Sequence, residues 1–388
     1  MDEKHSAPGV RTEGKKTQIL FVVRALHMGG VEKVLETYLT QLAQNPRVQC
    51  SVLCFEPIRE QWVLDMLAAL HMDYFDGYQM APVPKKTFFL LKWVKKLYYH
   101  FQRKSLPYRL KPLLERFDVL VDFTIYCANG LRLSSKPKIG WYHGGFSSFD
   151  FKEKQIKVIS GYEKIVCLTQ AFAQDLAEAL PELAPRLTHI YNPLDTESVR
   201  RLSEEKPEVP LEQPYFVAVQ RVVPEKDTET LIRAFQAFRR KHPEYRLYIV
   251  GDGSLLQQTM EKTDDPHIIF TGRSYNPYPI VNGARALVLS STLKFGEGLG
   301  MVLLEAQALG VLSISSDVKY GPREILMDGK AGILFEPESV ESCCAAMCRA
   351  VENPEETAEM VRTATENLHR FYAENNVRQF LRLIGVQD

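Results

Sequence analysis

Short apolar runs alternate with helical patterns along almost the whole chain. Most of these runs are continuously apolar, which is typical of parallel strands covered by helices on both faces. The alternation of such runs with helical stretches such as 31–44 predicts a doubly wound α/β architecture. The predicted strands lie at 18–24, 49–54, 118–123, 137–142, 163–168 and 187–191, and then at 215–220, 246–250, 267–271, 285–290 and 311–315.

The chain has 388 residues, which is more than one typical domain contains, so two domains are expected. We place the linker at 196–214, which is charged, contains prolines and shows no apolar period. The predicted order is a polar, disordered tail at 1–16, a Rossmann-like domain at 17–195, a second Rossmann-like domain at 196–366, and a C-terminal helix at 367–388 that could pack back on the first domain.

Composition and charge narrow the class of protein. Lys plus Arg and Asp plus Glu both total 48, and this zero net charge argues against a nucleic-acid binder. The seven cysteines include no Cys-x-x-Cys pair, as expected of free thiols in a reducing compartment. Residues 1–16 have no apolar signal core, and no run of 18 apolar residues occurs. These observations predict a cytoplasmic protein without a membrane span.

Ligands of open α/β sheets bind beyond the carboxyl ends of the strands, so the loops there hold the candidate residues. Gly29 and Gly30 follow the first strand and precede a helix, where phosphate can approach the backbone; a tight turn is the alternative. His143 follows the run 137–142 and either reaches a cleft or is a structural histidine in a turn. No full Gly-x-Gly-x-x-Gly occurs, which disfavours a dinucleotide dehydrogenase, and no Walker-type motif occurs either.

The second half contains the denser candidates. Arg221 and Lys226 follow the run 215–220, and such paired cations suit a pyrophosphate, although two solvated surface cations are the commoner outcome. Residues 295–306 place three glycines around Glu297 and put Glu305 on the apolar helix that follows. Burying an unpaired carboxylate is costly, so Glu305 indicates a functional site more than a first-turn glutamate favoured by the helix dipole.

These residues together resemble a known family. Glu297-x7-Glu305 within EGLGMVLLEA, preceded by VQRVVPEKD, resembles the retaining glycosyltransferases of family four, of the bacterial lipopolysaccharide and capsule type. Those enzymes have the GT-B fold, in which two Rossmann-like domains face each other across a cleft. The resemblance implies that the N-terminal domain at 17–195 binds the acceptor and that the C-terminal domain at 196–366 binds the nucleotide sugar. The similarity extends to IYNPLD, FTGRSYNPYPIV and YGPREIL, is looser at ALHMGG and WYHGG, and covers roughly residues 17–335.

The resemblance implies a role for each candidate. Glu305 would accept hydrogen bonds from the ribose hydroxyls, and Glu297 would position the donor sugar without acting as a nucleophile. Arg221 and Lys226 would neutralise the diphosphate leaving group, and His143 would lie near the donor sugar. The remaining donor-binding residues would contact phosphate, sugar or base mainly through their backbone; they are Gly29, Gly30, Arg273, Gly298, Leu299 and Gly300.

The activity implied by the resemblance is transfer of a hexosyl unit from a nucleotide-diphosphate sugar to a glycan or lipid-linked acceptor. The sequence motif NPYPIV favours a UDP-sugar as the donor. The absence of Asp-x-Asp implies that no metal ion is needed. No cofactor is expected besides the donor. Two alternatives remain open. A GT-B-fold sugar-nucleotide epimerase would have its catalytic carboxylates in other loops, and a non-catalytic GT-B partner subunit would have lost Arg221, Lys226 or Glu305.

The zero net charge conceals an asymmetry, because residues 1–195 contain 26 basic and 20 acidic side chains, and a basic stretch at 85–116 accounts for this excess. Ten of its side chains are Lys or Arg and one, Glu115, is acidic, with aromatic residues between them. It could be an amphipathic helix that contacts the anionic inner face of the cytoplasmic membrane, near a lipid-linked acceptor. The alternative is a core-packing helix with a solvated lysine face.

Overall fold

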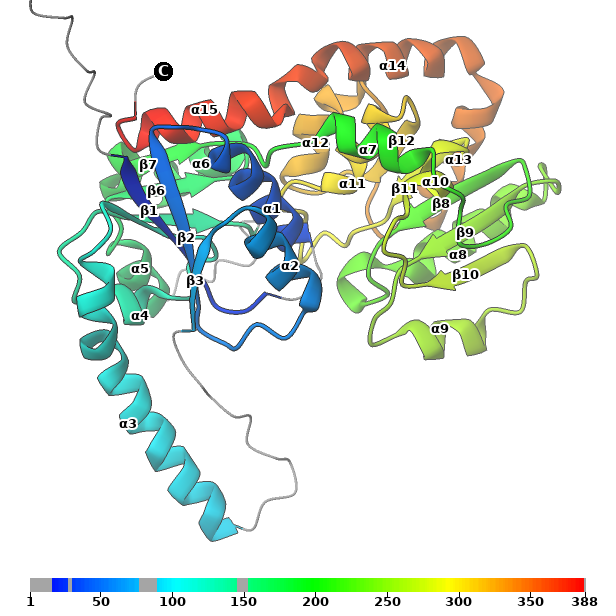
Figure 1. Ribbon diagram of the computed structural model, residues 1–388. Coiled ribbons are helices and arrows are strands. Elements are labelled where there is room, and N and C mark those ends of the chain that lie inside the picture. The colour runs from blue at the N-terminus through cyan, green and yellow to red at the C-terminus, as the bar shows by residue number, and fades with distance from the viewer. Residues whose placement is uncertain (1–15, 27–29, 77–88, 145–152, 387–388) are drawn as a thin grey trace, which may run out of the picture.

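The computed structural model describes residues 16–26, 30–76, 89–144 and 153–386, which form two α/β lobes side by side (Figure 1). Each lobe contains one sheet in which every pair of strands is parallel. The first sheet has the order β3-β2-β1-β4-β5-β6-β7 and the second β10-β9-β8-β11-β12-β13. The first and the last predicted strands lie in different sheets, so the chain forms two doubly wound domains.

The strands of the first sheet are β1 (Thr17–Val23), β2 (Val48–Cys54), β3 (Asp73–Asp76), β4 (Val119–Asp122), β5 (Lys138–Tyr142), β6 (Lys164–Cys167) and β7 (Leu187–His189). Its helices are α1 (Gly30–Ala43), α2 (Gln61–Ala69), α3 (Phe89–Leu114), α4 (Ala128–Leu131), α5 (Glu153–Ile159) and α6 (Gln170–Ala179).

The strands of the second sheet are β8 (Tyr215–Val219), β9 (Arg246–Val250), β10 (Ile268–Gly272), β11 (Ala286–Leu289), β12 (Leu312–Ser316) and β13 (Ile333–Phe335). The remaining helices are α7 (Thr196–Ser203), α8 (Thr228–Arg239), α9 (Leu256–Lys262), α10 (Tyr278–Asn282), α11 (Met301–Ala308), α12 (Gly321–Ile325), α13 (Val340–Glu352), α14 (Pro354–Asn367) and α15 (Ala373–Leu383).

Both faces of each sheet are covered, which explains the continuously apolar strands. In β1, Ile19 and Phe21 pack with α1 and α15, whereas Leu20 and Val22 pack with the end of α3. These four side chains are fully buried, and each contributes about 1.5–3 kcal/mol relative to an exposed position. The second sheet repeats the arrangement, with α8 and α13 on one face and α10 and α11 on the other.

Two strands and one helix were not anticipated from the sequence. The edge strands β3 and β13 have only four and three residues, too few to give a periodic pattern. The interpretation of 196–214 as a linker without regular structure is wrong for its first eight residues, which form α7. Asp195 caps this helix by accepting a hydrogen bond from the amide of Ser198 at 3.0 Å, and the buried Val199 fixes it against the second domain.

The C-terminal helix returns to the first domain (Figure 1). The ring of Phe380 on α15 lies 5.9 Å from that of Phe21, 5.9 Å from Tyr38 and 5.7 Å from Trp141. Where the chain crosses back, the amide of Leu194 donates to the carbonyl of Phe371 at 2.8 Å. The two segments that connect the domains therefore run side by side.

Helix α3 contains most of the basic stretch and extends away from the body of the first domain (Figure 1). Its final turns belong to the core, where Leu106, Leu110 and Leu114 are buried at a spacing of four residues. Phe101 and Tyr108 are exposed. The stretch therefore packs in the core at its end, while residues 85–88 lie outside the described part of the chain.

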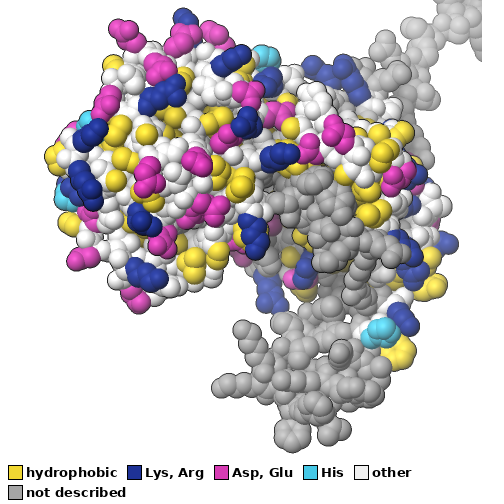
Figure 2. All heavy atoms as spheres, turned by 180° about the vertical axis from the view of Figure 1, so that it is seen from behind, with side chains coloured by type: hydrophobic (Ala, Val, Ile, Leu, Met, Phe, Trp, Pro, Cys, Tyr) yellow, Lys and Arg dark blue, Asp and Glu magenta, His cyan; other side chains and the backbone are white. Residues whose placement is uncertain are grey.

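The surface agrees with the zero net charge of the sequence. Figure 2 shows basic and acidic side chains interspersed over one face of the second domain. Among the helices in the described part of the chain, none combines the length and the apolar character needed to cross a bilayer. All seven cysteines are free, and five of them are buried.

Candidate active site

The loops at the carboxyl end of the second sheet bring Lys226 and Glu297 together. Lys226 ends a short 3-10 turn after β8, and Glu297 lies in the loop between β11 and α11. Their charged groups form an ion pair, and the hydroxyl of Ser291 donates to the same oxygen of Glu297. The side chains are only 17% and 12% exposed, so both charges are largely desolvated and depend on each other.

The backbone around this pair is fixed from two sides. The hydroxyl of Ser290 at the end of β11 donates to the carbonyl of Lys226 at 2.7 Å. The amide of Glu297 donates to the carbonyl of Lys319 at 2.9 Å, and the amide of Tyr320 donates back to the carbonyl of Glu297 at 3.0 Å. Asp227 adopts a left-handed conformation and caps α8. The positions of the two charges are therefore set by hydrogen bonds of the main chain.

Next to Glu297, the two domains come into close contact. A Cβ atom at Gly298 would lie 2.4 Å from the backbone carbonyl oxygen of His143 in the first domain. Glycine is the residue that allows this approach of backbone to backbone. Two residues further on, Gly300 has a φ of 89° and forms the N-cap of α11. The glycines of this loop thus serve the domain contact and the start of the helix.

His143 follows β5 and packs among aromatic rings. Its ring centroid lies 4.7 Å from that of Phe123 and is stacked with Trp141 at 6.3 Å. Burial lowers the pKa of His143 to about 3, and an interaction with the Phe123 backbone opposes this shift without cancelling it. Neither ring nitrogen makes a hydrogen bond of normal geometry within the described residues. His143 is therefore neutral at physiological pH and can act only as a hydrogen-bonding group.

Glu305 lies on α11 in a different environment. The hydroxyl of Tyr278 donates to Glu305 at 3.2 Å, and Lys33 of the first domain donates to that hydroxyl at 3.4 Å and lies 5.0 Å from the Tyr278 ring centroid. Burial raises the pKa of Glu305, while Lys33 and Tyr278 lower it by a smaller amount. These three residues line a pocket of about 310 Å³ between the domains, together with Gly30 and Met301.

The other predicted residues take more open positions. Arg221 is exposed, and its backbone carbonyl accepts a hydrogen bond from the amide of Val223 at 3.1 Å. The guanidinium of Arg273 lies 5.5 Å from the centroid of the exposed Tyr275 ring. Leu299 is buried beneath the loop, whereas Gly30 opens onto the pocket of Glu305. Gly29, expected beside phosphate, lies outside the described residues.

Sequence reasoning missed Ser291, Tyr278 and Lys33. Two polar residues that end an apolar strand run at its carboxyl end could have indicated Ser291. Tyr278 lies within the sequence motif NPYPIV, but the sequence offered no reason to assign it a role. No local signal marked Lys33, since a lysine on an amphipathic helix is usually solvated.

Comparisons with known proteins bear on the class of protein and on the fold. Residues 199–367, fewer than half of the chain, match the family model described as "Glycosyl transferases group 1". This segment contains Arg221, Lys226, Glu297 and Glu305. The resemblance to glycosyltransferases is thus confirmed at this coarser level.

Two curated relatives match parts of the chain. An exopolysaccharide phosphotransferase of Streptomyces coelicolor is 31% identical over 232 residues, which cover 58% of this chain and 24% of that protein. A GDP-mannose-dependent alpha-(1-6)-phosphatidylinositol monomannoside mannosyltransferase of Mycolicibacterium smegmatis is 30% identical over 159 residues, or 38% of this chain and 41% of that protein. The chain spans less than half the length of these relatives.

Among solved structures, Anabaena HepE in complex with UDP and glucose is similar with a TM-score of 0.76 at 17% identity. The alignment covers 96% of this chain and 100% of that one. At this identity the similarity establishes the fold. The predicted GT-B fold, with two parallel-sheet α/β domains, is therefore confirmed.

Proposed function

We propose that this protein is a glycosyltransferase that moves a hexosyl unit from a nucleotide-diphosphate sugar to a glycan or lipid-linked glycan acceptor. Cell-surface polysaccharide or lipopolysaccharide synthesis is the process that fits such an acceptor. The observation that carries the proposal is the desolvated Lys226–Glu297 pair, held where Gly298 meets His143 of the other domain. The match of residues 199–367 to group 1 glycosyl transferases supports it.

The chemistry requires stabilisation of the charge that develops on the leaving diphosphate. Lys226 and Arg221 are the cations available after β8, and the amides at the start of α11 favour an anion. When a donor binds, Lys226 exchanges the carboxylate of Glu297 for a phosphate oxygen, and Glu297 becomes free to accept hydrogen bonds from sugar hydroxyls. The ion pair thus keeps both groups in position before the donor arrives.

We assign a retaining, metal-independent mechanism. The bond between the sugar C1 and the phosphate oxygen breaks, and the acceptor oxygen bonds to C1 on the same face. The leaving phosphate takes the acceptor proton, so no carboxylate nucleophile is needed. The protein cations Arg221 and Lys226 take the place of a metal. His143, neutral because burial lowers its pKa to about 3, contributes a hydrogen bond to the sugar and no charge.

The nucleotide is assigned as UDP, with Glu305 as the acceptor of the ribose hydroxyl hydrogen bonds. The pocket beside Glu305 has a volume of about 310 Å³, and the carboxylate already accepts one hydroxyl, from Tyr278. HepE, which shares the fold, has been solved with UDP and glucose. The mannosyltransferase relative is GDP-mannose-dependent, so GDP-sugars are the alternative donors to compare with UDP-sugars.

Screening nucleotide sugars tests the proposal directly. UDP-, GDP- and ADP-sugars are compared by thermal shift and by release of nucleoside diphosphate, and the anomeric configuration of the product is read by NMR. Glu305→Ala should abolish the response, whereas Glu208→Ala, at an exposed position, should leave it intact. If no nucleotide sugar binds, the enzyme assignment is wrong. An epimerised donor as the product would indicate an epimerase, and binding without turnover would indicate a non-catalytic subunit.

We also propose that residues 85–116 contact an anionic membrane surface close to a lipid-linked acceptor. Helix α3 extends from the body (Figure 1), and Phe101 and Tyr108 are exposed along it. Basic side chains with exposed aromatics favour an anionic interface. In liposome flotation, the protein should bind anionic vesicles and not neutral ones, and exchanging the exposed Lys104 and Lys111 for Glu should abolish binding. Binding that is independent of lipid charge would refute this contact.

A further inference from the structure

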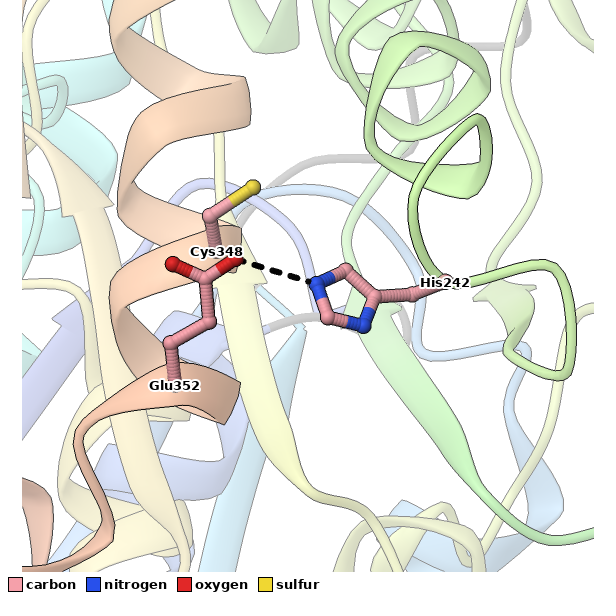
Figure 3. A group of neighbouring side chains, drawn as sticks. All are labelled: His242, Cys348 and Glu352. Atoms are coloured by element: carbon pink, nitrogen blue, oxygen red, sulfur yellow. Dashed lines mark hydrogen bonds and ion pairs between the residues drawn. The ribbon is translucent and has the colours of Figure 1, made fainter.

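A second group of chemically competent side chains lies in the second domain, where α8 and α13 pack together on the sheet. His242 is in the turn that follows α8, and Cys348 and Glu352 are on the last turns of α13 (Figure 3). One nitrogen of His242, the sulfur of Cys348 and one oxygen of Glu352 all lie within 4.8 Å of one another. Nothing in the proposed transfer reaction uses these residues.

The backbone and the ring orientation at this place are fixed. Cys348 and Glu352 are four residues apart, so they share one face of the helix. The ring of His242 is stacked on Phe238 with centroids 4.7 Å apart and planes inclined by 20°. Its Nε2 atom lies 3.3 Å from Oε1 of Glu352. Two helices of a packed domain therefore present the three donor atoms to one another.

We propose that His242, Cys348 and Glu352 form a structural binding site for a thiophilic divalent cation such as Zn²⁺. Zinc takes imidazole nitrogen and carboxylate oxygen at about 2.0–2.1 Å and thiolate sulfur at about 2.3 Å in a tetrahedron. Bonds of about 2.0 Å give an edge of about 3.3 Å in that geometry, which is the observed separation of His242 Nε2 and Glu352 Oε1. Water fills the fourth position.

The donor set selects the class of metal. A thiolate and an imidazole suit zinc and its neighbours in the first transition series, whereas Mg²⁺ and Ca²⁺ prefer oxygen ligands. Glu352 is also the last residue of α13, and the carboxyl end of a helix favours a cation. Lys241 is near enough to Cys348 to act on it electrostatically and opposes binding, but a thiolate and a carboxylate outweigh this single positive charge.

The position of the site indicates a structural role. Lys226 and Asp227 precede the first residue of α8, and His242 follows its last turn, so the length of this 12-residue helix, about 18 Å, separates them. The cation would tie the end of α13 to the turn between α8 and β9. It should therefore raise thermal stability without taking part in sugar transfer.

The test uses the full-length protein, reduced and dialysed against chelator. Titration with Zn²⁺ should give one site per chain by calorimetry and raise Tm, and Co²⁺ should give the absorption of a tetrahedral site with a thiolate-to-metal band. Cys348→Ser and His242→Ala should weaken Zn²⁺ binding at least tenfold. His369→Ala is the control, because this histidine is exposed and is not a member of the cluster, and the variant should bind normally.

Any of four outcomes would overturn the site. Equal Zn²⁺ affinity of the wild type and Cys348→Ser would assign binding to another group, and a Co²⁺ spectrum without a thiolate band would do the same even if a variant failed to fold. Equal stabilisation by Mg²⁺ would show that the thiolate has no role. If no metal binds at all, His242 and Glu352 form only the hydrogen bond that ties the two helices together.

Discussion

At the carboxyl end of the second sheet, Lys226 and Glu297 are opposite charges held against each other. At the same end of the first sheet, Asp122 is fully buried at the end of β4 among uncharged donors. It accepts a hydrogen bond from the hydroxyl of Tyr162 at 2.6 Å and another from the amide of Cys127 at 2.9 Å. Burial raises its pKa to about 6, and these hydrogen bonds lower it by less.

The two domains therefore stabilise their buried polar groups in different ways. In the second domain a charge is balanced by a charge, so the pair can be exchanged for the charges of a ligand. In the first domain burial works against ionisation, raising the pKa of Asp122 and lowering that of His143 to about 3. A neutral His143 provides a hydrogen bond without a charge, whereas Asp122, with a pKa of about 6, is largely ionised at neutral pH and is held by the donors around it. The second domain thus balances charge with charge, and the first stabilises its buried carboxylate through hydrogen bonds from uncharged partners.

The largest effect is expected when one charge of the Lys226–Glu297 pair is removed. Lys226→Met should lower kcat/KM for transfer by about 100- to 1,000-fold, because a donor to the developing diphosphate charge is lost. It should also cost ~2 kcal/mol of unfolding free energy, because Glu297 is left desolvated without its partner. Steady-state kinetics and urea unfolding measure the two effects.

A double variant separates the two effects. Lys226→Met with Glu297→Gln should recover most of the stability and none of the transfer. Lys206→Met, at an exposed position, is the control. Near-normal turnover of Lys226→Met would refute the assignment of the leaving-group site.

The second prediction concerns the contact between the two domains at Gly298. Gly298→Ala should lower kcat by about 100-fold, since the added Cβ pushes the loop away from His143 by roughly an ångström and misaligns the reacting groups. Thermal unfolding should change little, because the strain can be relieved by domain opening. Small-angle scattering should show a more open particle, and an unchanged kcat would argue against catalysis at this contact.

The third prediction concerns stability against pH. Because the pKa of Asp122 is raised from 3.8 to about 6, the folded protein binds a proton that the unfolded chain releases in this range. Its contribution is therefore fully present below about pH 4 and is lost as pH rises to about 6, at most on the order of 3 kcal/mol.

The variant Asp122→Asn should flatten this part of the stability profile, measured by urea unfolding between pH 4 and 7. Asp73→Asn, at an exposed position, should keep the wild-type slope. If Asp122→Asn keeps the wild-type slope as well, the carboxyl group is not held in the way described.

The smallest expected effect is at Tyr278. Tyr278→Phe removes the hydroxyl that joins Lys33 to Glu305 while keeping the ring. We expect a KM for the donor about 3- to 10-fold higher, which corresponds to the roughly 1 kcal/mol of one ordinary hydrogen bond, with kcat nearly unchanged. Tyr275→Phe, on the exposed ring, should have no effect. A change in kcat and not in KM would give Tyr278 a role in the chemical step.

The sequence predicts those features that depend on residues close together in the chain. The apolar runs predicted eleven strands because most of them are buried on both faces, and the glycine-rich helix start marked Glu297, Gly298 and Glu305. The edge strands β3 and β13 were too short to show a period. Helix α7 was hidden because Val199 and Ser203 are the only fully buried positions among its eight residues.

The remaining site residues depend on long-range packing. Lys33 and Tyr278 are 245 positions apart in sequence, so no motif could join them. The same holds for the buried state of Asp122 and His143, since each lies next to an apolar run and either burial or exposure would fit that pattern. Their role depends on Tyr162 and Phe123, which approach only after the sheet has formed.

The return of α15 to the first domain has a consequence for synthesis of the chain. Phe380 covers Phe21, Tyr38 and Trp141, so the first domain is discontinuous and includes a helix that follows the whole second domain in sequence. On the ribosome, the second domain can complete its core while part of the earlier one is still uncovered. A ribosome-bound or truncated chain lacking α15 exposes an aromatic surface, and a chaperone that recognises such surfaces would distinguish it from a chain in which α15 has docked.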